Sequence, residues 1–115
     1  YKTEQEGMHA KINTYHVSLF ARFVDKLANT PDGDGSLLDH SLLLYGSGMG
    51  DGNVHSRDPI SSMVVGGANG RIAGNQHIRM PKSTPQANML VSVLNVAGIP
   101  TESIGNSTGA VPIEA

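Results

Sequence analysis

The stretch LLDHSLLLYGSGMGDGNVH, residues 37–55, decides how the rest of the chain is organised. Its first half contains the apolar run LLLY at residues 42–45. A continuous apolar run is typical of a strand that is covered on both faces of a sheet, because neither side needs to be polar. We therefore expect residues 41–46 to form a central buried strand.

The glycine-rich segment after this strand carries the polar side chains of Ser47, Asp51, Asn53 and His55. In open α/β sheets, ligands bind outside the carboxyl ends of the strands. Glycine also lets the backbone approach a ligand closely. Two interpretations stay open at this point: a loop that binds a ligand, and a tight strand-to-loop connection with no chemistry.

Within this loop the side chains differ in the ligands that they can hold. Asp51 and His55 are the candidates for a metal ion, and Ser47, Asn53 and Arg57 are the candidates for binding, with Arg57 suited to an anion. On an irregular segment, a spacing of four residues does not bring two side chains onto one face as it would on a helix. A second hypothesis is therefore that His55 only bonds a backbone carbonyl to close the loop.

The composition excludes several classes of protein. The 115 residues are enough for one domain, and the net charge of −2 comes from 8 basic and 10 acidic residues that are spread along the chain. We expect no nucleic-acid partner, because the basic residues form no cluster. The chain has no cysteine, which excludes disulfides and thiolate zinc sites. It also has no run of about 18 apolar residues, so we expect no membrane span.

The first part of the chain has the periodicity of an amphipathic helix. Apolar residues recur at spacings of three and four and form a stripe, which Phe20 and Val24 widen. The residues of the stripe are Met8, Ile12, Tyr15, Leu19, Phe23 and Leu27. This pattern predicts a helix over residues 8–28, with the polar residues 1–6 frayed unless an upstream segment continues them. Residues 31–35, PDGDG, end the helix and predict a surface turn.

Three further elements are predicted after the polar loop. Residues 60–65 (ISSMVV) predict a short strand, and the Gly/Asn-rich segment after it predicts a hairpin leading to a strand at residues 76–80. Thr84 as N-cap and Pro85 as first helical residue predict a helix over residues 85–97.

The pattern also predicts which residues are buried in this helix and in the C-terminal tail, residues 102–115 (ESIGNSTGAVPIEA). We expect the helix to bury Ala87, Leu90, Val91, Leu94 and Ala97. The tail has no periodicity, and we expect Ile104 and Val111 to hold it in place.

Together these elements predict an α/β fold in which a central buried strand of a partial sheet is flanked by two helices. Two or three strands make an incomplete sheet. We therefore expect residues 1–115 to be a single α/β domain that is a fragment of a longer chain, with the missing N-terminal part as its partner. An apolar surface would remain exposed, and a homo-oligomer is one way to cover it.

Several segments of the sequence resemble a known bacterial family. They are KINTYHVSLFARFVDKL, TPDGDGSLLDHSLLLYGSGMGDGNVHS, GGANGRIAGNQHIRMP and TPQANMLVSVLNVAGIPTESIGNSTG. In this order they resemble the C-terminal part of the family named domain of unknown function 1552, over nearly the whole chain. That family is distantly similar to the alkaline phosphatase and sulfatase superfamily.

The resemblance implies an alkaline-phosphatase-like fold and an exported protein, periplasmic or secreted, whose signal would lie upstream of this chain. It places Ser47 at a serine of the superfamily, Gly48 and Met49 at its metal-binding Asp and His, and His55 at a later histidine. The nucleophile and the first metal ligands would lie upstream of Tyr1. Gly48 and Met49 depart from the pattern, because neither binds a hard cation as a carboxylate or an imidazole does.

Two classes of function follow from the resemblance. In the first, the chain is part of an exported bacterial protein, is non-catalytic alone and has a binding or scaffold role. In the second, it is part of a metal-dependent phosphatase- or sulfatase-like hydrolase. The full-length protein would then hold a divalent metal such as zinc and hydrolyse phosphoric or sulfuric esters.

Overall fold

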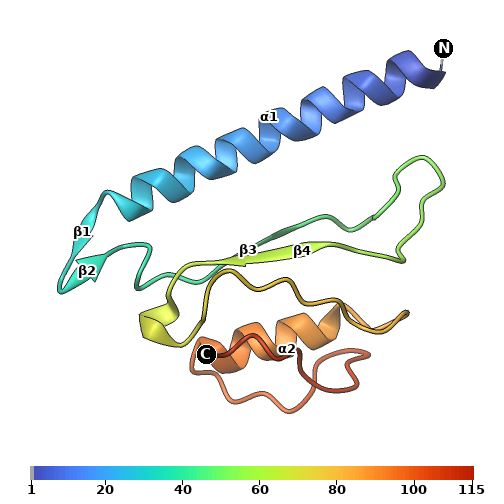
Figure 1. Ribbon diagram of the computed structural model, residues 1–115. Helices are drawn as coiled ribbons and strands as arrows, with labels where there is room; N and C mark the ends of the chain where they lie inside the picture. Colours follow the sequence, from blue (N-terminus) through green and yellow to red (C-terminus); the bar gives the residue numbers. More distant parts are fainter. Residues whose placement is uncertain (1) are drawn as a thin grey trace. The chain divides into compact units, whose positions relative to one another are not determined.

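The computed structural model describes residues 2–115, and Figure 1 shows their secondary structure. The described residues form a mixed α/β structure with two helices and two small antiparallel sheets of two strands each. The coarse prediction of α/β content is therefore confirmed. The chain divides into two compact units: the first ends at Leu38, and the second spans Asp39–Ala115.

The first unit consists mainly of helix α1 (Lys2–Ala28). The predicted helix is confirmed, but it begins at Lys2, and the prediction that residues 2–6 are frayed was wrong. The segment at residues 2–6, KTEQE, is polar but rich in Lys, Glu and Gln, which are good helix formers. At the other end, the Asn29 side-chain amide donates to the Asp25 carbonyl at 2.8 Å, and Pro31 follows.

A tight hairpin follows α1 in the same unit. Strand β1 (Pro31–Asp32) pairs antiparallel with β2 (Gly35–Ser36). Gly33, in the turn between them, has a φ of 60°, a left-handed conformation that glycine adopts without steric cost. The predicted surface turn at residues 32–35 is confirmed.

In the second unit, strand β3 (Leu43–Gly46) pairs antiparallel with β4 (Ser62–Val65), in a register that places Leu43 opposite Val65. Of the strand predicted at residues 60–65, the structure contains residues 62–65. The central buried strand is not confirmed. Among residues 2–115, β3 has a single neighbour, β4, on one edge. Its residues alternate between half-buried and exposed, with Leu44 39% exposed. Such alternation is typical of an antiparallel ribbon with one solvated face.

The core of the second unit is small. Its buried residues are Ala68, Val96, Val111 and Ile113. Partly buried apolar side chains pack against them: Leu42, Ile72, Met80, Met89 and Val93. The core therefore joins the short 3-10 helix η1 (Ala68–Gly70), helix α2 (Ala87–Val96) and the C-terminal tail.

The tail is held in a partly different way from the prediction. Val111 is buried as expected, but Ile104 is 39% exposed, so the prediction that it holds the tail was wrong. Ile113 is buried instead. Near it, Ile72 and Glu114 form an isolated antiparallel bridge.

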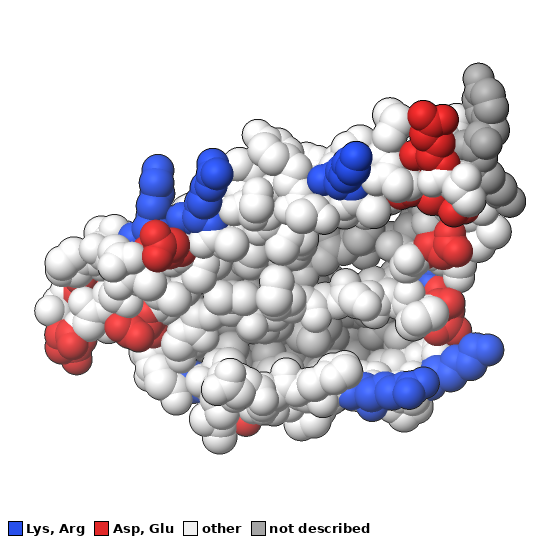
Figure 2. Space-filling view, turned by 45° about the horizontal axis from the view of Figure 1, so that its top comes forward, with Lys and Arg blue, Asp and Glu red and all other residues white. Residues whose placement is uncertain are grey.

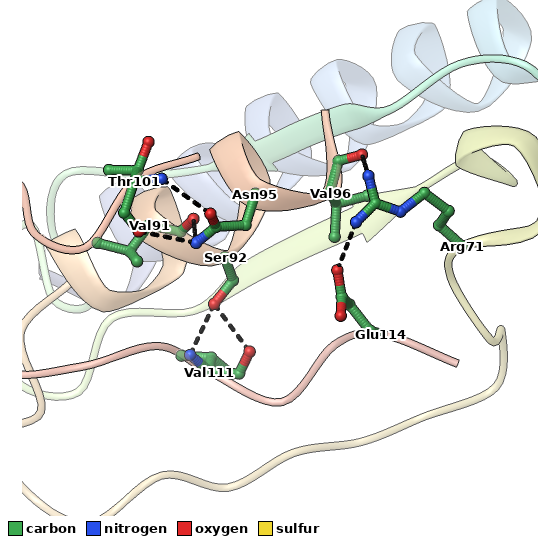
Figure 3. A network of polar contacts seen from close by, with 8 residues as sticks. All are labelled: Arg71, Val91, Ser92, Asn95, Val96, Thr101, Val111 and Glu114. Carbon is green, nitrogen blue, oxygen red and sulfur yellow. Dashed lines mark hydrogen bonds and ion pairs between the residues drawn. The ribbon is translucent and has the colours of Figure 1, made fainter. Parts of the chain in front are cut away.

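Three polar side chains of α2, Asn88, Ser92 and Asn95, hold the tail and the residue before it, Thr101, through hydrogen bonds. Figure 3 shows the bonds of Ser92 and Asn95. The Asn88 side-chain oxygen accepts the Thr108 N–H at 2.8 Å, and the Ser92 hydroxyl accepts the Val111 N–H at 2.6 Å. The Asn95 amide accepts the Thr101 N–H at 2.9 Å and donates to the Thr101 carbonyl at 2.9 Å. Segments far apart in the sequence are thus joined by side chain to backbone bonds.

These bonds explain why the predicted buried face of α2 was partly wrong. Val91 is buried as expected, but Leu90 is 37% exposed and Ala97 is exposed. Asn88 and Ser92 are each only 5% exposed. Polar residues at helical spacing normally mark a solvated face, but here the tail satisfies their hydrogen bonds, so burial costs little.

Two local predictions near α2 were also wrong. The N-cap is Gln86, and the Thr84 hydroxyl instead donates to the Pro81 carbonyl at 2.7 Å. Residues 76–80 form no strand, and η1 stands where the hairpin was expected. The tail, which is distant in sequence, supplies the bridge partner of Ile72 in place of a local hairpin.

Candidate functional site

The predicted polar loop connects β3 to β4 and spans residues 47–61 (Figure 1). It begins at the carboxyl end of β3, as expected. The pair of strands that it joins is antiparallel, however, so the rule that ligands bind at the carboxyl edge of a parallel sheet does not apply here. The loop is a long hairpin connection in which Ser47, Asp51, Asn53, His55 and Arg57 are all exposed.

The end of this loop is a turn closed between Asp51 and Ser56. The Ser56 N–H donates to the Asp51 carbonyl at 3.0 Å, and the Gly50 N–H donates to the Ser56 carbonyl at 3.0 Å. The Asp51 carboxylate accepts the N–H groups of Asn53 at 2.8 Å and Val54 at 3.3 Å. Asp51 therefore uses one carboxylate oxygen to hold its own turn, which is the ordinary role of aspartate in such turns.

His55 takes part in this turn through its backbone. Its φ of 56° is left-handed, a conformation that few non-glycine residues adopt, although histidine, asparagine and aspartate adopt it several-fold more often than the others. In the described part of the chain, its ring forms no hydrogen bond or ion pair. The hypothesis that its imidazole closes the loop by bonding a carbonyl is therefore not supported by the geometry; its backbone conformation closes the loop instead.

The other loop residues form local contacts. The Ser47 hydroxyl accepts the Met49 N–H at 3.3 Å, and the Ser56 hydroxyl donates to the Asp58 carbonyl at 3.0 Å. The Asp58 carboxylate accepts a long bond of 3.4 Å from the Ser83 hydroxyl. The loop thus brings the five predicted side chains onto one exposed segment. Apart from the long bond between Asp58 and Ser83, the polar contacts given above are made to the backbone of the loop itself.

Residues 2–115 contain no group of three or more His, Asp or Glu side chains placed to hold one ion. Asp51 and His55 therefore have no third protein ligand of these types nearby within this range. A catalytic zinc ion normally takes three protein ligands and a water molecule.

Sequence reasoning missed a shallow hollow in the second unit, with a volume of about 330 Å³. Its lining includes His40, Asn69 and Arg71 together with backbone at the end of α2. The Arg71 guanidinium donates to the Val96 carbonyl at 2.7 Å and forms an ion pair with Glu114 at 2.9 Å (Figure 3). The sequence pattern placed Arg71 in a turn. No spacing in the sequence indicates that it contacts Val96, which lies 25 positions later, or Glu114, which lies 43 positions later.

The backbone beside this hollow is tightly packed. The Asn69 N–H donates to the Asp39 carbonyl at 2.9 Å, and the Ala68 N–H donates to the Ser41 carbonyl at 3.0 Å. A Cβ atom at Gly67 would lie 2.6 Å from the Asp39 carbonyl oxygen, so only glycine fits there.

The surface charge is mixed. On the face drawn in Figure 2, lysine and arginine side chains stand among acidic and neutral ones and form no large continuous basic area. Among residues 2–115, no helix is both long enough and apolar enough to cross a membrane.

Comparison of the chain with known protein families, curated proteins and solved structures finds no match.

Proposed function

We propose that this chain is part of an exported bacterial protein with an alkaline-phosphatase-like fold, and that the chain has a binding or scaffold role and is not catalytic alone. The observation that carries the binding role is the apolar face of α1. Met8, Ile12, Tyr15, Leu19 and Phe23 share that face and are each between 41% and 60% exposed. Contiguous apolar surface of this kind marks an interaction site.

The geometry of the polar loop supports the absence of catalysis by the chain alone. Asp51 bonds its own turn, and Ser47 bonds the Met49 N–H. No base is placed against the Ser47 hydroxyl by the contacts of the described residues, and a serine nucleophile needs such a base within hydrogen-bond distance. The resemblance to domain of unknown function 1552 adds the exported location, periplasmic or secreted.

The alternative is a role as part of a metal-dependent phosphatase- or sulfatase-like hydrolase. The observation that favours it is that Ser47, Asp51, Asn53, His55 and Arg57 share one exposed loop. A divalent metal such as zinc would then be held by Asp51 and His55 together with ligands from upstream of Tyr1, which would also supply the nucleophile.

Activity and metal-binding measurements on the 115-residue chain distinguish the binding or scaffold role from the hydrolase. We expect no turnover of aryl phosphate or aryl sulfate esters with zinc, manganese or calcium, and no zinc binding tighter than micromolar in calorimetric titration. His55→Ala should change neither result. Turnover or tight zinc binding that His55→Ala abolishes would refute the proposal and support the hydrolase.

A further inference from the structure

We propose that the apolar face of α1 binds the same face of a second copy of this chain, with the two helices antiparallel. This inference deepens the proposed binding role by naming the partner. It rests on the five side chains of the apolar face, Met8, Ile12, Tyr15, Leu19 and Phe23, and on the charges at the two ends of the helix. All of these residues belong to the first unit.

The positions of these five exposed apolar residues are symmetric along the helix, and the half-buried Phe20, Val24 and Leu27 are not part of the symmetric set. Ile12 and Leu19 lie at equal distances on either side of the midpoint between Tyr15 and His16, and so do Met8 and Phe23. A two-fold interface requires this property, because residue i of one copy must contact residue j of the other and the reverse. In an antiparallel pair, Ile12 then meets Leu19, Met8 meets Phe23, and the two Tyr15 residues lie near the axis.

The spacing of the stripe also suits a nearly straight pair of helices. Ile12 and Phe23 are eleven residues apart, as are Met8 and Leu19. A repeat of eleven residues corresponds to about 3.67 residues per turn, slightly above the roughly 3.6 of a straight helix, so the pair needs only a gentle right-handed supercoil. The apolar face therefore runs along α1 with little winding around it, and one partner helix can follow it over its length.

The charges at the ends of α1 select the antiparallel orientation. Glu4 lies in the first turn and Lys26 in the last turn. In the antiparallel register given above, Glu4 of one copy lies within one residue of the level of Lys26 of the other. A parallel pair would instead place Glu4 near Glu4 and Lys26 near Lys26, which repel, and flanking charges set the orientation of paired helices.

The first experiment measures the oligomeric state. We expect a reversible monomer–dimer equilibrium in sedimentation, and we expect Leu19→Glu to weaken the dimer by at least about tenfold. Ala21→Glu is the matched control, because it adds the same charge to the same helix on a face away from the stripe. It should leave the equilibrium unchanged. A chain that is monomeric at every concentration, or a dimer that Leu19→Glu does not weaken, would overturn the proposal.

The second experiment tests the orientation without depending on the stability of Leu19→Glu. The chain has no cysteine, so Ile12→Cys and Leu19→Cys introduce single thiols. When the two variants are mixed and oxidised, we expect the cross-link between residue 12 of one copy and residue 19 of the other to dominate. Cross-links predominantly between identical variants would show a parallel pair and overturn the proposed orientation.

A charge exchange gives an independent measurement of the same geometry. Glu4→Lys alone and Lys26→Glu alone should each weaken the dimer, and the double variant should restore it, with the differences reduced by salt. Additive effects in the double variant would refute the contact between Glu4 and Lys26. Failure of the pairing is distinguishable from failure of the proposed function, because the latter appears as His55-dependent turnover or zinc binding.

Discussion

The single hydroxyl of Ser92 serves both backbone groups of Val111. It accepts the Val111 N–H at 2.6 Å and donates to the Val111 carbonyl at 2.8 Å, and both residues are buried. In a sheet, two backbone groups of a neighbouring strand would supply these bonds. Here one side chain of α2 supplies them, so the tail is paired without a strand beside it.

Ser92→Ala should therefore destabilise the second unit more than its small change in size suggests. The substitution leaves the buried Val111 N–H and carbonyl without a partner, which we expect to lower the free energy of unfolding by about 1–3 kcal/mol. Urea denaturation measures this difference. The matched control is Ser103→Ala, the same chemical change at an exposed position, which should stay within about 0.5 kcal/mol. Equal effects of the two variants would contradict the role of Ser92.

A comparison of Arg71→Met with Glu114→Gln should separate the energies of the two contacts that the Arg71 guanidinium makes. Arg71→Met keeps the apolar stem and loses both the bond to the Val96 carbonyl at the end of α2 and the ion pair with Glu114, at an expected cost of about 1–2 kcal/mol. Glu114→Gln removes only the exposed ion pair and should cost less than about 0.5 kcal/mol. In concentrated salt the effect of Arg71→Met should persist. If salt abolished it, the ion pair would be the dominant contact.

Two isoleucines of the tail should respond differently to truncation. Ile113 is 6% exposed and belongs to the core, so we expect Ile113→Ala to cost about 2–5 kcal/mol. Ile104 is 39% exposed, and Ile104→Ala should cost less than about 1 kcal/mol. Thermal or urea unfolding of the two variants checks this order, and the reverse order would restore Ile104 as the residue that holds the tail.

The polar loop offers a matched pair of glycine substitutions. A Cβ atom at Gly50 would overlap the backbone carbonyl oxygen of Pro59, so Gly50→Ala forces the two sides of the loop apart. A Cβ atom at Gly48 meets nothing within 4 Å. We expect Gly50→Ala to cost about 1–3 kcal/mol and to speed amide exchange at Ser56, whereas Gly48→Ala changes neither. Identical exchange in both variants would contradict the close approach at Gly50.

The sequence predicted where the two helices lie better than it predicted which segments pair or pack with each other. The apolar period located α1 and α2, and Pro31 with the DGDG segment located the turn after α1. The apolar run of residues 42–45 did not predict how many neighbours β3 has, because a fully covered strand and a half-covered one can share such a run. Pairing is a non-local property, and so is the burial of Asn88 and Ser92 by the tail.

The sequence predicted where the polar loop lies in the chain, but not which contacts its side chains form. The loop lies at the carboxyl end of β3 with all five proposed side chains exposed on it. The role of Asp51 as the acceptor of two N–H groups in its own turn depends on the backbone path, and the left-handed conformation of His55 is part of that path. Spacing along an irregular segment carries no such information.

The pairing of α2 with the tail has a consequence for how this part of the chain can vary. The Asn95 side chain donates to the Val91 carbonyl within α2 at 3.0 Å, and it bonds Thr101 through the backbone N–H and carbonyl of that residue. Every amino acid except proline presents those two groups, so substitutions at position 101 preserve the contact. Position 95 is restricted to a side chain that can both donate and accept. The two residues of this contact therefore differ in the substitutions that they tolerate. We expect amino-acid substitutions to accumulate at position 101 and to be rare at position 95.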